Sequence, residues 1–197
     1  LSADHGVAHN VRYMDEHNIP SGSIRTKELQ KEINDSIFSK FVIKNAVLKI
    51  ENAQLYLNTQ LMNQSAVQSA EIEKYVVDIL SQKSFINRAY SLKNINQYNV
   101  PEVLRVMSEN SFHNKRSGDI QLVLNPGYME GSGKGSTRGN WSPDDAHIPL
   151  VWFGWGIKKG KLNREVHMTD IAPTLAALLH IQMPNGCVGK VIEEVRK

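Results

Sequence analysis

Long apolar runs, disulfide bonds and a charge excess of one sign are all missing from this 197-residue chain. Its longest apolar stretches, 148–153 and 171–179, fall far short of the roughly 20 residues that a membrane-spanning helix needs. Cys187 is the only cysteine, so no internal disulfide can form. Nothing in the composition therefore indicates a membrane span or a disulfide-stabilised small domain.

Charge is balanced as well: 23 Lys and Arg stand against 20 Asp and Glu, and the basic residues are scattered among the acids. A nucleic-acid-binding protein normally has a basic stripe with interleaved aromatic residues, whereas the 7% aromatic residues here are spread along the chain. We therefore expect no nucleic-acid partner. The 41% hydrophobic content suffices for a substantial core.

Helices and a hairpin are predicted in the first half of the chain. Leu29, Ile33 and Ile37 recur every four residues and predict a helix over 26–41. Two alternating runs, 46–50 and 54–58, predict a β-hairpin. The side chains expected to face the core are Leu48, Ile50, Leu55 and Leu57.

The next segment predicts a helix over 66–80, a strand over 85–92 and a third helix after Asn99. Asn99 can cap this helix and Pro101 suits its first turn. Its buried side is expected to carry Val103, Leu104 and Met107.

The second half predicts strands at 119–124 and 148–153 and a helix at 170–179, which is βα organisation. Residues 127–139 hold five glycines and predict an irregular loop. This loop does not match a phosphate-binding P-loop, because Lys134 is followed by Gly135 instead of Ser or Thr. The strands are apolar almost throughout, which predicts an α/β fold whose sheet is covered by helices on both faces.

Asp4-His5-Gly6 follows what reads as the end of a buried strand, so we expect the beginning of this domain, and any targeting signal, to lie upstream. Ligands bind at the carboxyl ends of strands in α/β sheets, which makes Asp4 and His5 candidate ligands. The alternative is a simple strand-to-turn junction in which Asp4 binds nearby backbone.

His147 directly precedes a predicted strand. Together with Asp4 and His5 it supplies one oxygen and two nitrogen ligands, a set that suits zinc. Asp144 and Asp145 are interpreted as turn formers, and either could orient His147 as its hydrogen-bond partner. The other five histidines, at 9, 17, 113, 167 and 180, show no ligand spacing and are interpreted as surface residues.

Five short segments in the same order resemble the C-terminal half of the alkaline phosphatase superfamily. They are 4–6 (DHG), 116–120 (RSGDI), 126–128 (PGY), 145–150 (DAHIPL) and 169–175 (TDIAPTL). The resemblance is greatest to the periplasmic bacterial alkaline phosphatases with a threonine nucleophile, which are related to nucleotide pyrophosphatase/phosphodiesterases. It covers residues 1–18 and 115–197, so we expect 19–114 to be a helix and hairpin insertion.

The resemblance implies a site with two zinc ions, in which Asp4 and His5 ligate one ion and His147 the other. It also implies that the nucleophile, the phosphate-binding residues and the remaining ligands lie upstream of Leu1. The chain departs from the family at 136–139, where it reads Ser-Thr-Arg-Gly and relatives often read Thr-x-His-Gly. The resemblance therefore assigns no role to Arg138.

All expectations about the function of this chain come from this resemblance. The leading interpretation is the C-terminal part of an exported, zinc-dependent phosphate monoester hydrolase, inactive by itself, whose partners are a phosphate ester and the missing N-terminal part. A phosphodiesterase or nucleotide pyrophosphatase of the same superfamily is the alternative within the enzymes. A non-catalytic binding module remains open, as do sulfatase and phosphonate hydrolase activities, because a fold does not determine a substrate.

Overall fold

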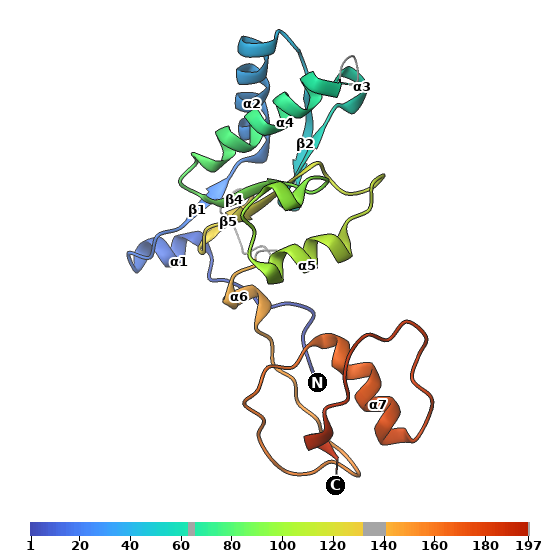
Figure 1. Ribbon diagram of the computed structural model, residues 1–197. Coiled ribbons are helices and arrows are strands. Elements are labelled where there is room, and N and C mark those ends of the chain that lie inside the picture. The colour runs from blue at the N-terminus through green and yellow to red at the C-terminus, as the bar shows by residue number, and fades with distance from the viewer. Residues whose placement is uncertain (63–65, 132–140, 197) are drawn as a thin grey trace. The chain divides into compact units, whose positions relative to one another are not determined.

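The computed structural model describes residues 1–62, 66–131 and 141–196 (Figure 1). The chain divides into two compact units. The sheet unit comprises residues 4–148, and the terminal unit comprises residues 1–3 together with 149–197.

The sheet unit contains most of the regular secondary structure. In chain order it runs α1 (Val11–Glu16), β1 (Gly22–Ile24), α2 (Thr26–Phe41), β2 (Val47–Glu51), β3 (Gln54–Leu57), α3 (Thr59–Met62), α4 (Ala66–Ser81), β4 (Ile86–Ser91), α5 (Glu102–Ser111), β5 (Ile120–Leu124), β6 (Tyr128–Glu130) and α6 (Pro143–Ala146). A 3-10 turn, Ile95–Gln97, lies between β4 and α5.

Four of these strands form an antiparallel sheet in the order β2-β3-β5-β4. In this register Ile120 lies opposite Leu55 on one side and Ser91 on the other. β1 and β6 form a separate two-stranded parallel pair. β5 thus joins the hairpin to β4, although more than 60 residues separate it from β3 in sequence.

Helices cover both faces of the four-stranded sheet. α2 packs against β2 and α4 against β4, and their apolar faces form one core with Leu55, Ile120 and Leu122 (Figure 1). A second, smaller core forms around Tyr90, whose hydroxyl bonds the Ser108 hydroxyl of α5 at 2.9 Å. Successive side chains of β4 therefore pack into cores on opposite faces of the sheet, as the alternation of side chains along a strand requires.

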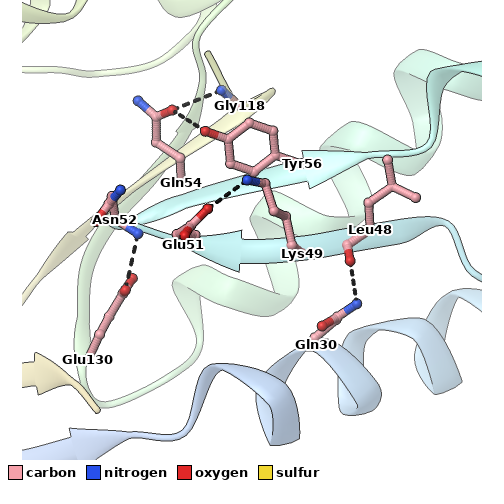
Figure 2. A network of polar contacts seen from close by, with 9 residues as sticks. All are labelled: Gln30, Leu48, Lys49, Glu51, Asn52, Gln54, Tyr56, Gly118 and Glu130. Atoms are coloured by element: carbon pink, nitrogen blue, oxygen red, sulfur yellow. Dashed lines mark hydrogen bonds and ion pairs between the residues drawn. The ribbon is translucent and has the colours of Figure 1, made fainter. Parts of the chain in front are cut away.

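The hairpin turn between β2 and β3 is held by a carboxylate from β6 (Figure 2). Asn52 and Ala53 both have positive φ, 51° and 55°, as a two-residue hairpin turn requires. Their backbone N–H groups donate to Glu130 over 3.1 and 2.7 Å. Glu130 therefore satisfies two donors that the turn leaves outside the strand ladder, and it links the two sheets.

The terminal unit is organised around Asp170. It contains a 3-10 turn (Met168–Asp170), α7 (Ile171–Leu179) and a final 3-10 turn (Glu193–Val195). The Asp170 carboxylate accepts N–H donors from His167 and Lys190 over 2.9 and 2.8 Å. Thr174 continues the connection, because its hydroxyl donates to the Asp170 carbonyl and accepts from the Ile192 N–H. Together these bonds attach the start of α7 to residues 190–192.

Most predicted elements are confirmed. α2 has the predicted bounds, α4 and β4 lie within one or two residues of theirs, and the hairpin forms as β2 and β3. The fold is the predicted mixed α/β class. The five histidines interpreted as surface residues are all exposed.

Predicted core positions were wrong in two elements. Leu48 is 54% exposed and Val47 is buried instead, because a bulge between Val47 and Lys49 shifts the alternation of side chains. In α5 Leu104 is buried as predicted, whereas Val103 and Met107 are exposed. The helix begins two residues later than expected, at Glu102, with Pro101 at its cap and no side-chain cap from Asn99.

Two backbone predictions were also wrong. The predicted strand 148–153 is reduced to one bridge in the described residues, between Leu150 and Ser2. The start of the predicted loop 127–139 forms β6, since Tyr128–Glu130 finds a partner in β1. Arg138 and the other loop residues from 132 onward lie outside the described part of the chain.

The compact units also differ from the predicted domains. β5 follows residue 114, yet it pairs with β3 and β4, which both come from the predicted insertion 19–114. The chain instead divides between Ala3 and Asp4 and between Ile148 and Pro149. That 19–114 is inserted into a family α/β domain formed by 1–18 and 115–197 stays a prediction.

We expect Glu130→Gln to lower the free energy of unfolding of the sheet unit by about 1–2 kcal/mol, because one turn N–H then faces an amide nitrogen in place of a carboxylate oxygen. Hydrogen exchange at the Ala53 amide and urea unfolding measure the change. Glu51→Gln is the matched control: Glu51 pairs with Lys49 and both side chains are exposed, so its loss should cost less than about 0.5 kcal/mol. Equal effects would contradict a role for Glu130 in holding the turn.

Acid should weaken the terminal unit through Asp170. Burial opposes ionisation of Asp170, but the backbone N–H donors of His167 and Lys190 outweigh it and hold its pKa below the ordinary 3.8. Stabilisation by the ionised group is therefore complete above about pH 4 and is lost as pH falls through the lower folded pKa. We expect Asp170→Asn to destabilise at neutral pH and the difference from wild type to shrink below pH 4.

Thr174→Val is the comparison variant for this titration. It removes the hydroxyl that links Asp170 to Ile192 without removing a charge, so its cost should be the same at pH 7 and pH 3. Thermal unfolding of both variants across this range separates the two effects. A constant cost for Asp170→Asn would show that the charge of Asp170 is not involved.

Candidate metal centre

Asp4 and His5 lie in the extended segment that precedes α1, at the beginning of the sheet unit. The Asp4 carboxylate is 81% exposed, whereas the His5 ring is 29% exposed. His5 Nδ1 lies 2.6 Å from the Gly6 carbonyl oxygen. Because a carbonyl only accepts hydrogen bonds, Nδ1 must carry the proton, and the lone pair of the neutral ring is then on Nε2.

The spacing of these two side chains suits a shared ion. Nε2 of His5 lies 3.5 Å from Oδ2 of Asp4, which is longer than an ordinary N–H···O hydrogen bond. Two ligands of a tetrahedral zinc ion, each about 2.1 Å from the metal, are separated by about 3.4 Å. The backbone bond at Nδ1 also matches the usual way in which a zinc-binding histidine is oriented. This pair therefore fits two of the ligand positions of a zinc ion.

His147 is brought toward this segment by the backbone. The Gly6 N–H donates to the Asp145 carbonyl over 2.7 Å, which joins the segment after His5 to α6. His147 directly follows α6, and its own N–H closes the helix on Pro143 over 2.9 Å. Its backbone is extended, with φ −90° and ψ 109°, and the residue is exposed.

The three predicted ligands thus belong to one compact unit, although 142 positions separate His5 from His147. Among the described residues, no group of three or more His, Cys, Asp or Glu side chains is arranged to hold a metal ion. The assignment of Asp4, His5 and His147 as zinc ligands stays a prediction. Asp145, interpreted from sequence as a turn former, is a buried residue of α6 whose carbonyl makes the connection to Gly6.

Sequence reasoning missed the residues that position the site. The Gly6 N–H and the Asp145 carbonyl connect the two ligand segments through main-chain atoms, which leave no trace in residue type. Gly118 is another such case: an added Cβ would lie 2.9 Å from the Leu55 carbonyl oxygen, so glycine is needed for β5 to approach β3. A short motif can mark a segment as functional, but it does not show which backbone atoms of other segments that segment contacts.

Comparison with known proteins gives consistent results over the whole chain. It is 40% identical over 196 residues to a protein named calcium-transporting ATPase from Myroides odoratus. It is 39% identical over 196 residues to alkaline phosphatase PafA from Elizabethkingia meningoseptica. The 1.7 Å crystal structure of wild-type PafA superposes on all of this chain with a TM-score of 0.90 at 39% identity.

The chain belongs to the alkaline phosphatase superfamily. It corresponds to the C-terminal portion of its superfamily relatives and spans 36% of the length of each of the two curated proteins. It covers 38% of the PafA chain in the crystal structure. No family model matches the sequence. Among the described residues, no helix of this superfamily member has the length and apolarity needed to cross a membrane.

Proposed function

We propose that the full-length protein is a zinc-dependent phosphate monoester hydrolase of the alkaline phosphatase type, to which this chain contributes part of the metal centre. The observation that carries the proposal is the Asp4–His5 pair, with its ligand spacing of 3.5 Å and its Nδ1 anchored on Gly6. Similarity to alkaline phosphatase PafA over the whole chain supports the reaction class.

Each ligand has a distinct part in this proposal. Asp4 and His5 hold one zinc ion and His147 holds the other. Bound zinc polarises a phosphate oxygen and lowers the pKa of an attacking hydroxyl. The Gly6 carbonyl keeps the His5 ring in the tautomer with its lone pair on Nε2, so the ligand is oriented before an ion arrives. The Gly6–Asp145 bond limits how far the His147 segment can move from the pair.

The rest of the machinery is assigned to the part of the protein that precedes Leu1. A catalytic zinc ion typically has three protein ligands, and this chain offers two for one ion and one for the other. The nucleophile, expected to be threonine or serine, and the groups that bind phosphate also belong to that part. Its location is proposed to be the periplasm or another exported compartment, by similarity to bacterial phosphatases of this kind.

In the full-length enzyme, His147→Ala should lower phosphatase activity by at least about two orders of magnitude, because one zinc ion loses a ligand. Turnover of a nitrophenyl phosphate ester and zinc content measured on the same sample provide the test. His113→Ala is the matched control, since His113 is exposed and lies on a loop that carries no predicted ligand. Unchanged turnover at full zinc occupancy would refute the role of His147.

The 197-residue chain by itself should hydrolyse no phosphate ester and should bind zinc only weakly. It offers at most two protein ligands to either ion and has no nucleophile to form a covalent intermediate. Assay of the purified chain in excess zinc, with metal measured after dialysis, tests this expectation. Robust turnover that His147→Ala removes, or two tightly held zinc ions per chain, would show that the site is complete within these residues.

A further inference from the structure

The segment that follows α7 contains the one Asn-Gly pair of the sequence, Asn185-Gly186. The pair forms a turn in which the Cys187 N–H donates to the Pro184 carbonyl over 3.3 Å. Of the two central residues only Gly186 has a positive φ, 76°, which is the pattern of a type II turn with glycine in its third position. A bond of this length is longer than an ordinary N–H···O hydrogen bond, so the turn is weakly closed.

Little else holds this turn in place. Asn185 and Gly186 are exposed, and among the described residues no other backbone hydrogen bond engages 182–187. A Cβ built on Gly186 would meet nothing within 4 Å, whereas a Cβ on Gly189 would lie 2.0 Å from the Thr169 carbonyl oxygen. The chain is therefore closely packed again only after the turn, and the Gly186 N–H has no acceptor among the described residues.

This arrangement suits attack of the Gly186 main-chain nitrogen on the Asn185 side chain. The nitrogen gives its proton to a solvent base and forms a bond to Cγ of Asn185, and the side-chain amide takes up a proton and leaves as ammonia. The product is a five-membered succinimide ring. Water then opens the ring at either carbonyl, which gives aspartate or isoaspartate. Glycine favours the attack because no Cβ shields its nitrogen.

We propose that Asn185 is a site of spontaneous deamidation in the folded protein, with Gly186 supplying the attacking nitrogen and water completing the reaction. Ring closure requires the backbone at Asn185 to rotate out of the turn. The bond between Pro184 and Cys187 resists this rotation, and a single hydrogen bond of this kind slows an opening step by about tenfold at most. The product carries one more negative charge, and isoaspartate adds one carbon to the main chain.

Asn52-Ala53 is the opposite case within the same chain. Asn52 also lies in a tight turn and is followed by a small residue. The Ala53 N–H, however, donates to Glu130 over 2.7 Å, and Ala53 is buried in the hairpin between β2 and β3. Ring closure at Asn52 would have to break this bond and distort the hairpin. The surroundings of the two turns therefore select Asn185 over Asn52.

Peptide mapping of the full-length protein after incubation at neutral pH tests the proposal. The peptide that contains Asn185 should gain about 1 Da, because an NH₂ group is exchanged for OH. A synthetic peptide with the sequence of residues 181–189, kept under the same reducing conditions, gives the rate without the folded turn. We expect the rate in the protein to lie within about tenfold of the rate in the peptide. Isoaspartate should be among the products, and Asn52 in the same digest should stay unconverted.

Two variants test the chemistry. Asn185→Gln should stop the change at this position, because ring closure would need a less favourable six-membered ring, and it leaves the residue with positive φ untouched. Gly186→Ala should slow the reaction by at least about tenfold in protein and peptide alike, since its Cβ restricts the backbone and crowds the nitrogen. A rate in the protein more than about tenfold below that of the peptide would overturn the proposal. Aspartate as the sole product, or equal conversion of Asn52 and Asn185, would overturn it as well.

Discussion

Asp119 is the residue on which the four-stranded sheet depends. Its backbone N–H donates to Leu55 of β3, and its backbone carbonyl accepts from Leu92 just after β4. Its buried carboxylate accepts the Leu57 N–H over 2.8 Å and the Lys93 ammonium over 2.8 Å. One residue thus binds both neighbours of β5 at the point where that strand enters the sheet. Such a carboxylate is stable only because each oxygen has a donor.

This arrangement has an electrostatic consequence for α4. Burial raises the pKa of Glu73 on α4 above its ordinary value; the Ser91 hydroxyl opposes this shift, the Asp119 charge adds to it, and Lys93 opposes it. The Lys93 ammonium therefore pairs with Asp119, while its charge also lowers the pKa of Glu73. The cluster makes the position of β5 specific, since any shift in its register would leave Asp119 without its donors. The same sheet unit carries Asp4, His5 and His147.

Carboxylates that bind backbone N–H groups recur throughout the chain. Glu130 holds the hairpin turn from β6, Asp119 holds β3 from β5, and Asp170 holds residues 190–192 from the start of α7. Each joins segments that are distant in sequence. The candidate metal centre is joined in a similar way, but through main-chain atoms of Gly6 and Asp145. The His5 ring is thus held by a backbone contact, and the Gly6–Asp145 bond joins the segment after Asp4-His5 to the segment before His147.

Local pattern in the sequence determined the elements whose stabilising contacts are close in the chain. The spacing of Leu29, Ile33 and Ile37 defines α2, and the motif DHG predicts Asp4 and His5 as ligands from residue type alone. Tertiary structure alone decided what depends on distant partners: the bulge that exposes Leu48, the pairing of β5 with β3 and β4, the parallel pair β1-β6 and the reduction of 148–153 to one bridge. Periodicity records which face of a segment is apolar, whereas a strand also needs a neighbour that pairs with its backbone, and the pattern of one segment does not show which distant segment supplies that neighbour.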